Sequence, residues 1–267
     1  MPTKRSQQNA GASKASVCPI NRKGTLYVVA VPIGHPDDVT IRAVRILGQV
    51  GIIASEDPNT TQQLLMHHSI QATVTSYGPL NLREKVAVLL QRLQQGIDVA
   101  FVSDCGSPLV ADPGHLLVEA AHAHDIPVVP IPGPSVIIAA LTAAGFPCES
   151  FYFFGSLPSA TTRYTQSLLD FQKKDSPTVA FCTEPMVARI LKTLSSLCPR
   201  CTVAVVYDLT KPNESIIRGT VREVRERLGP TQKREVTLVL HGRGGTDSGN
   251  QETRRVQSVS SRRIKTR

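Results

Sequence analysis

Apolar runs rich in β-branched residues alternate with amphipathic segments along the first half of the chain. The apolar runs predict strands at residues 24–31, 50–54, 73–77, 97–102 and 126–131. The amphipathic spacing predicts helices at residues 39–47, 60–67, 82–95, 115–124 and 135–144. Asp37 or Asp38 is a candidate cap for the first helix. Such alternation is typical of a doubly wound domain with a parallel sheet, which we expect over residues 24–148.

The second half continues the alternation, with fewer glycine-rich strand ends. Strands are expected at residues 151–154, 178–182, 203–207, 215–219 and 235–241. Helices are expected at residues 161–174, 186–197 and 221–228. The pattern therefore predicts a second α/β domain over residues 149–242, and a fold class of two α/β domains.

Positive charge is concentrated at the two ends of the chain. Residues 1–23 hold five Lys/Arg and no acid, and residues 243–267 hold seven Lys/Arg against two acids, within a net charge of +9. We expect both tails to be disordered, because they offer little to bury. They either add affinity for nucleic acid or only keep the protein in solution. No apolar run approaches the length of a membrane span, so a cytoplasmic location without membrane contact is expected.

The six cysteines do not form the pattern of a disulfide framework. Most lie within or beside apolar segments, where a free cysteine behaves as a small hydrophobic residue. Cys198 and Cys201 form a CxxC pair, but a zinc site needs a second pair or histidines at ligand spacing. We expect this pair to be structural or incidental, and we expect no metal site.

Two loops rich in Gly, Pro, Ser and Asp carry the clearest chemical signal. Residues 103–114 follow the strand expected at 97–102, and residues 132–135 follow the strand expected at 126–131. Loops at the carboxyl ends of parallel strands form ligand clefts in open α/β sheets. Gly106 allows a close backbone approach, Ser135 can cap the next helix, and Asp104 can accept hydrogen bonds from a ribose or an amine. Alternatively, these side chains make only turn hydrogen bonds.

Several segments occur in an order that resembles a known family. They are residues 25–29 (TLYVV), 32–34 (PIG), the pair at 56–57 (ED), 103–108 (SDCGSP), 112–114 (DPG), 132–134 (PGP) and 209–211 (LTK). This series is similar to the ribosomal RNA small subunit methyltransferase I family, within the tetrapyrrole methylase superfamily. The resemblance covers residues 24–242.

The resemblance implies S-adenosylmethionine bound between two α/β domains, a homodimer, and 2′-O-methylation of a cytidine in small-subunit ribosomal RNA. It implies these cofactor-binding residues: Pro32, Asp104, Gly106, Ser107, Pro132, Gly133, Ser135, Val136 and Leu209. Tyr207 and Lys211 would approach from the second domain, with Lys211 the first candidate to position substrate or manage its proton. Glu56 and Asp57 come second. Alternatively, Lys211 is a solvated loop lysine and the acidic pair belongs to a helix N-terminus.

Three positions where the family has arginine are neutral here, namely Asn59, Val187 and Tyr207. Because arginine is hard to replace in phosphate recognition, the acceptor is less defined than the methyl donor. Two alternatives stay open. One is methylation of a tetrapyrrole or corrin precursor, and the other is a non-catalytic RNA-binding or assembly factor that retains the cofactor cleft.

Overall fold

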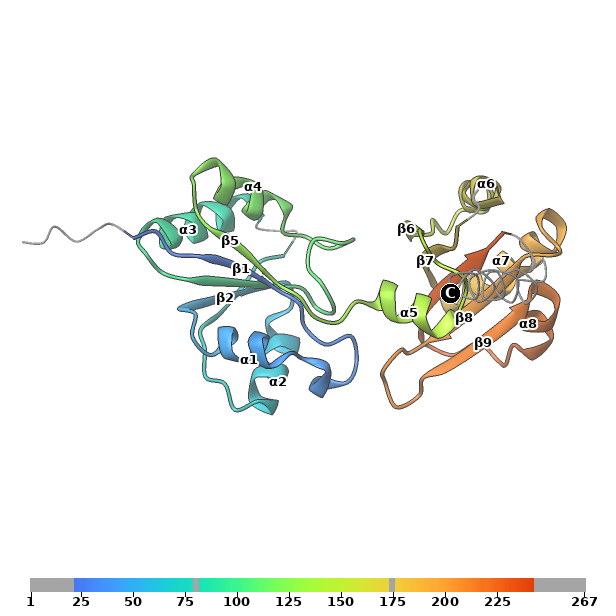
Figure 1. The fold of residues 1–267 in the computed structure, drawn as a ribbon, viewed down its shortest axis with the longest axis horizontal. Helices are drawn as coiled ribbons and strands as arrows, with labels where there is room; N and C mark the ends of the chain where they lie inside the picture. Colours follow the sequence, from blue (N-terminus) through green and yellow to red (C-terminus); the bar gives the residue numbers. More distant parts are fainter. Residues whose placement is uncertain (1–21, 79–81, 173–175, 243–267) are drawn as a thin grey trace, which may run out of the picture.

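The computed structural model describes residues 22–78, 82–172 and 176–242. Two β-sheets, each with its own helices, lie one after the other along the long axis of the molecule (Figure 1). Residues 1–21 and 243–267 lie outside these ranges. The expectations of disorder and of contact with nucleic acid fall on these two tails. Within the described residues, no helix is long and apolar enough to cross a membrane.

The first sheet has five strands in the order β3-β2-β4-β1-β5, all of them parallel. The strands are β1 (Leu26–Val29), β2 (Ile52–Ser55), β3 (Val74–Ser76), β4 (Val99–Val102) and β5 (Val128–Ile131). The helices are α1 (Ile41–Leu47), α2 (Pro58–His67), α3 (Leu82–Gln94) and α4 (His115–Ala123). The expected parallel, doubly wound arrangement is confirmed.

Helices cover both faces of this sheet, which buries its central strand β4 completely. One core joins α1 and α2 to the sheet, and another joins α3 and α4 to the opposite face (Figure 1). The neighbouring strands β1 and β4 are followed by helices on opposite faces, α1 and α4. Such a divergence opens a crevice at the carboxyl ends of the strands.

The second sheet is mixed and has the order β6-β7-β10-β8-β9. Its strands are β6 (Tyr152–Ser156), β7 (Thr178–Thr183), β8 (Thr202–Tyr207), β9 (Ser215–Thr220) and β10 (Glu235–His241). Only β6 and β7 pair in parallel, and the other neighbours are antiparallel. The helices α6 (Thr161–Gln172), α7 (Glu184–Leu197) and α8 (Val221–Arg227) cover one face.

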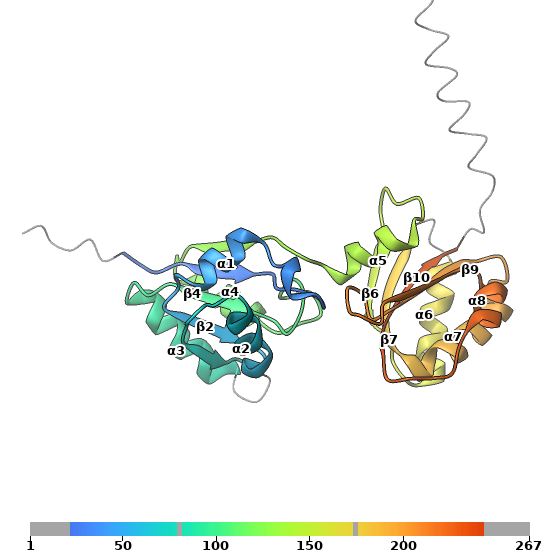
Figure 2. The same cartoon turned by 90° about the horizontal axis from the view of Figure 1, so that it is seen from below.

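The helix α5 (Val136–Ala144) links the two halves. The helical alternation places it in the first domain, but Ile137, Ala140 and Leu141 pack on the second sheet, on the face opposite α6–α8 (Figure 2). By packing, the chain passes from one domain to the other in the loop between β5 and α5. A loop predicted to bind ligand therefore lies at the junction of the domains.

Two helix caps differ from the sequence prediction. Thr40, rather than Asp37 or Asp38, caps α1, and its Oγ1 accepts a hydrogen bond from the Ala43 N–H at 3.1 Å. The two aspartates lie in a short 3-10 helix, η1 (Pro36–Asp38). Ser135 holds the N-cap position of α5, but its side chain makes no capping hydrogen bond. Sequence spacing locates the start of a helix only to within about one turn. It therefore does not decide which of several neighbouring polar residues caps the helix.

Cys198 and Cys201 form a disulfide bond, so this pair has a structural role, although the six cysteines do not form the pattern of a disulfide framework. The end of α7 and the turn into β8 place their Cα atoms 5.4 Å apart, within the range that a disulfide spans. The spacing of a CxxC pair does not reveal this, because it is shared by metal sites and reduced thiols. Among the described residues, Cys105, Cys148 and Cys182 are free.

Candidate functional site

The loops after β1, β4 and β5 are joined into one surface by hydrogen bonds. The Val31 N–H donates to the Gly106 carbonyl at 2.9 Å, and the Gly106 N–H donates back to Val31 at 3.1 Å. The Ser107 hydroxyl donates to the Pro134 carbonyl at 3.2 Å. The structure thus brings together the two loops that the sequence singled out, and it adds the loop after β1.

The loop after β4 depends on backbone conformations that side chains disfavour. Gly106 has φ +71° and Gly114 has φ +127°. A Cβ atom on Gly114 would lie 2.3 Å from Cε1 of the buried Phe101 ring. Leu109 and Ala111 also have positive φ, at +72° and +65°. The loop is therefore held in an unusual path that two glycines make possible.

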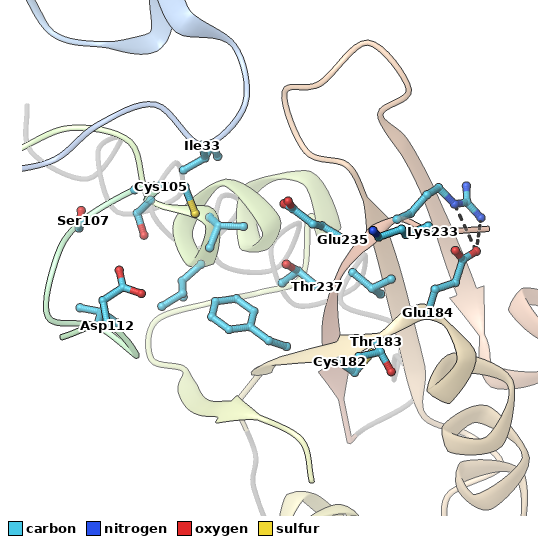
Figure 3. A pocket seen from close by; sticks show the side chains of 18 of the residues that line it. Ile33, Cys105, Ser107, Asp112, Cys182, Thr183, Glu184, Lys233, Glu235 and Thr237 are labelled. Atoms are coloured by element: carbon cyan, nitrogen blue, oxygen red, sulfur yellow. Dashed lines mark hydrogen bonds and ion pairs between the residues drawn. The ribbon is translucent and has the colours of Figure 1, made fainter. Parts of the chain in front are cut away.

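A cavity of about 580 Å³ lies between the two domains, within the size range of cofactor sites (Figure 3). From the first domain it is lined by Ile33, Cys105, Gly106, Ser107, Val110 and Asp112, and from the junction by Ser135, Val136 and Ile137. From the second domain it is lined by residues 181–185 and 232–237. Its walls are mostly apolar, with a few polar groups at the rim, as expected for a planar organic ligand. We call this space the donor cavity.

A second cavity, of about 610 Å³, lies beside the first. It is lined by residues 31–34, Pro36, Thr60, Thr61, Gln63, Leu64, His67, residues 103–105, Lys211 and Glu235. Ile33, Cys105 and Glu235 line both cavities, so the two spaces meet at these side chains. We call this space the acceptor cavity.

Acidic side chains gather at the carboxyl ends of β2 and β4. Burial raises the pKa of Glu56, and the charges of Asp104 and Asp112 raise it further. The pKa of Asp104 is raised by burial and by Asp57, and that of Asp112 by burial and by Asp104. Crowded carboxylates disfavour one another's charge, so a positively charged ligand placed among them would be stabilised.

A buried ion pair supports the second-domain wall of the donor cavity. The Arg234 guanidinium donates to the Glu184 carboxylate at 2.6 Å, and Glu184 also accepts from the Gln232 N–H at 2.9 Å. The Arg234 guanidinium lies 3.8 Å from the centre of the Tyr207 ring. Hydrogen bonding and the negative charge of Glu184 raise the pKa of Arg234. A cation therefore stands over position 207, where the family's arginine is missing.

The loop after β8 brings Lys211 to the first domain. Lys211 Nζ lies 2.5 Å from Glu235 Oε1, in the acceptor cavity. The neighbouring Thr210 Oγ1 accepts a hydrogen bond from the His35 N–H at 3.0 Å, across the domain junction. A Cβ on Gly34 would lie 2.8 Å from the Leu209 carbonyl oxygen. The two domains thus touch closely where Lys211 enters.

The predicted site residues divide into three groups. Gly106, Ser107, Ser135 and Val136 line the donor cavity. Pro32, Asp104 and Lys211 line the acceptor cavity. The remaining predicted residues line neither cavity: Glu56, Asp57, Pro132, Gly133, Leu209 and Tyr207.

Three of these remaining residues make contacts that show a structural role. Asp57 caps α2, accepting hydrogen bonds from the Asn59 N–H and the Thr60 hydroxyl at 2.9 Å each, and these bonds lower its pKa. Gly133 lies so close to β1 that an added Cβ would be 3.0 Å from that of Ala30. Tyr207 is buried beneath Arg234. For Asp57, the geometry matches the alternative of a helix N-terminal residue.

Several cavity residues were not identified from sequence. Phe181, Cys182 and Thr237 come from the neighbouring strands β7 and β10, and Thr60 and Gln63 come from α2. Burial raises the pKa of the Cys182 thiol to about 12, so it is a neutral wall group. These residues lie in ordinary amphipathic segments. Only the arrangement of β7, β10 and α2 in space shows that they line the cavities.

Comparisons with known proteins agree with this architecture. A family model described as tetrapyrrole (corrin/porphyrin) methylases matches residues 25–225. The protein named ribosomal RNA small subunit methyltransferase I from Micromonospora olivasterospora is 36% identical over 221 residues, covering 82% of this chain and 71% of the relative. Its namesake from Hydrogenobaculum sp. (strain Y04AAS1) is 39% identical over 221 residues, covering 80% of this chain and 94% of the relative.

Among solved structures, the cobalamin biosynthetic enzyme cobalt precorrin-4 methyltransferase has a similar fold. It superposes with a TM-score of 0.64 at 20% sequence identity, covering 84% of this chain and 98% of that one. The match spans both domains and therefore includes the junction that holds the cavities. On the sequence matches, this chain belongs to the tetrapyrrole methylase family, and within it to the ribosomal RNA small subunit methyltransferase I group, as an S-adenosylmethionine-dependent methyltransferase.

Proposed function

We propose that this chain methylates small-subunit ribosomal RNA in the cytoplasm, at the 2′-hydroxyl of a cytidine ribose. The observation that carries the proposal is the meeting of two cavities at Ile33, Cys105 and Glu235. A donor held in one cavity and a ribose held in the other would meet at this point. The names of relatives that are 36% and 39% identical support RNA as the acceptor.

The donor cavity fits S-adenosylmethionine in size and chemistry. When bound, this cofactor supplies a reactive methyl group on a positively charged sulfur. The apolar walls, including Val136 and Phe181, suit the adenine ring, while the backbone at Gly106 and Ser107 can approach polar atoms closely. Asp112 lines this cavity, and Asp104 lines the acceptor cavity next to Cys105, which lines both, so the two carboxylates can favour a cationic ligand. Pro132, Gly133 and Leu209 would shape the cavity from behind.

Lys211 and Glu235 are the residues best placed to act on the acceptor. Their ion pair lies in the acceptor cavity, and Glu235 also reaches the donor cavity. We assign Lys211 to hold a phosphate or ribose oxygen, and Glu235 to take the proton from the 2′-hydroxyl. Closure of the two domains around the reactants would align them and exclude water. Glu56 would act only through Asp104, whose backbone N–H it accepts.

We further propose that the protein forms a homodimer through the free edge of the second sheet. The edge strand β6 exposes Tyr152 and Phe154, and Phe151 precedes them. Exposed aromatic side chains on an edge strand favour association. Light scattering after gel filtration would report twice the chain mass, and a Phe154→Lys variant would shift this mass towards the monomer.

The direct test is transfer of tritiated methyl groups to isolated small ribosomal subunits, followed by mapping of the labelled nucleotide. We expect label at one ribose, and loss of label in a Glu235→Gln variant. Asp104→Ala should weaken the binding of S-adenosylmethionine by at least about tenfold, or 1.4 kcal/mol. Lys192→Met, on an exposed position of α7, is the matched control. Label on a precorrin-type substrate but not on subunits would contradict the choice of acceptor.

A further inference from the structure

Three metal-binding side chains converge at the rim of the acceptor cavity. His67 Nε2 lies 2.9 Å from Asp37 Oδ1, and His68 Nε2 lies 3.2 Å from the Pro36 carbonyl oxygen. One ligand atom from each of Asp37, His67 and His68 lies within 4.8 Å of the other two. No other such cluster occurs in the described part of the chain.

The end of α2 explains how two consecutive histidines face the same point. Neighbouring residues within a helix project about 100° apart and do not meet. His67 is the last residue of α2, whereas His68 is its C-cap with φ −96° and ψ 11°, outside helical geometry. The two rings consequently lie 4.7 Å apart in a T-shaped arrangement. Asp37 reaches them from η1, so the cluster joins segments 30 residues apart.

We propose that Asp37, His67 and His68 bind a divalent transition metal of the zinc class. The two imidazole nitrogens are borderline ligands, which suit Zn²⁺ and disfavour Mg²⁺ and Ca²⁺, and Zn²⁺ also accepts a carboxylate oxygen. Bonds of about 2.0–2.2 Å to a tetrahedral ion place ligand atoms roughly 3.5 Å apart. The separation of His67 Nε2 from Asp37 Oδ1 is 2.9 Å and no separation in the cluster exceeds 4.8 Å, so the ligand atoms are already close to this spacing. His68 Nε2 donates its proton to the Pro36 carbonyl in this structure, so coordination through this nitrogen would require the proton to move to Nδ1.

The surroundings already hold the carboxylate in place. The His35 Nδ1 accepts a hydrogen bond from the Asp37 N–H at 3.3 Å, which fixes the start of η1. The His35 N–H in turn donates to Thr210 of the second domain. All three metal-binding side chains are at least partly exposed, so an ion can enter from solvent and keep a water ligand. The ion would tie η1 to the end of α2.

The test uses the full chain with Cys198 and Cys201 both changed to Ser, so that this pair of thiols cannot bind metal. After treatment with a chelator, the protein is titrated with ZnCl₂ by calorimetry. We expect about one equivalent to bind, with His68→Ala and Asp37→Asn each weakening binding by at least about tenfold. A His122→Ala/His124→Ala variant is the control, because it removes two exposed histidines of α4 and its C-cap.

X-ray absorption at the zinc edge provides a readout that does not depend on affinity. We expect nitrogen and oxygen ligands only, including imidazole, and an imidazole signal reduced in His68→Ala. Thermal unfolding without metal confirms that each variant folds. Zinc binding that is equal in the His68→Ala, Asp37→Asn and control variants would overturn the proposal, as would sulfur ligation. Either result would leave Asp37 and His67 as a hydrogen-bonded surface pair only.

Discussion

The two walls of the donor cavity are built by different physical means. On the first-domain side, loops are held by backbone hydrogen bonds between Val31 and Gly106 and by positive φ at Gly106 and Gly114. On the second-domain side, the wall depends on side chains, above all the buried pair of Glu184 and Arg234. One wall is specified by main-chain geometry, and the other by charge pairing.

This difference explains why the donor is easier to recognise than the acceptor. A loop that needs glycine at positive φ tolerates few substitutions, so its sequence motif can still be recognised in a divergent chain. A charged side chain, by contrast, can come from another segment of the chain. Position 207 is a tyrosine here, and the Arg234 guanidinium, carried by the segment before β10, lies over its ring. A cation of this chain thus lies over the position where the sequence resemblance implies an arginine.

The strongest way to break the first wall is Gly114→Ala. The new Cβ would collide with the fully buried Phe101 ring, which packs edge-to-face on Tyr77 and cannot move aside. We expect the free energy of unfolding to fall by about 3–4 kcal/mol, with loss of S-adenosylhomocysteine binding. Urea unfolding and calorimetry measure the two effects.

The matched control for this change is Gly145→Ala, at φ +58° with nothing within 4 Å of the added Cβ. Backbone strain alone should cost it about 1–2 kcal/mol. An equal loss of stability in the two variants would show that the contact with Phe101 is unimportant.

The second wall is broken most directly by Arg234→Met. The substitution keeps an apolar side chain over Tyr207 but leaves the buried Glu184 carboxylate without its cation. We expect a loss of about 3 kcal/mol in the free energy of unfolding. Arg222→Met is the control, since its pair with Glu226 is exposed to solvent and contributes little to stability. Similar losses in the two variants would contradict a supporting role for the buried pair.

Lys211→Met separates the two walls functionally. Lys211 lines the acceptor cavity and its positive charge would not favour a cationic donor, so donor binding should change less than about twofold while kcat/KM for small subunits falls by about ten- to a hundredfold. Calorimetry with S-adenosylhomocysteine and steady-state methyl transfer give the two quantities. A large loss of donor affinity would instead place Lys211 in the donor site.

The smallest expected effect concerns the acidic cluster of the first wall. The folded-state pKa of Asp112 is raised from its ordinary 3.8 by burial and by Asp104. The folded protein therefore binds more protons than the unfolded chain, and this group reduces stability as the pH rises from about 4 through the raised pKa.

Asp112→Asn removes that penalty and should raise the free energy of unfolding at neutral pH by about 0.5 kcal/mol or less. The gain should vanish at a pH below about 4, where the Asp112 carboxyl is protonated in both the folded and the unfolded protein. Urea unfolding at the two pH values measures the difference. A gain that persists at low pH would point to packing rather than charge.

The elements themselves could be predicted to within one to two residues at most ends. The buried run at β4 and the amphipathic spacing of α3 are local signals, and both match the structure. The cap of α1, the Cys198–Cys201 bond and the packing of α5 could not be predicted. Each depends on which segments meet in space, and single-sequence periodicity does not contain that information.

The sequence by itself determined the alternation of strands and helices, the two glycine-bearing loops and the family to which they belong. Their signals are local, because a positive φ or a buried strand restricts which residues can stand at a given position. Only the tertiary structure decided that the predicted site residues divide between two cavities meeting at Glu235, and that Arg234 covers Tyr207. Those relations join residues far apart in the chain, and they arise from the pairing of strands and the contact between domains.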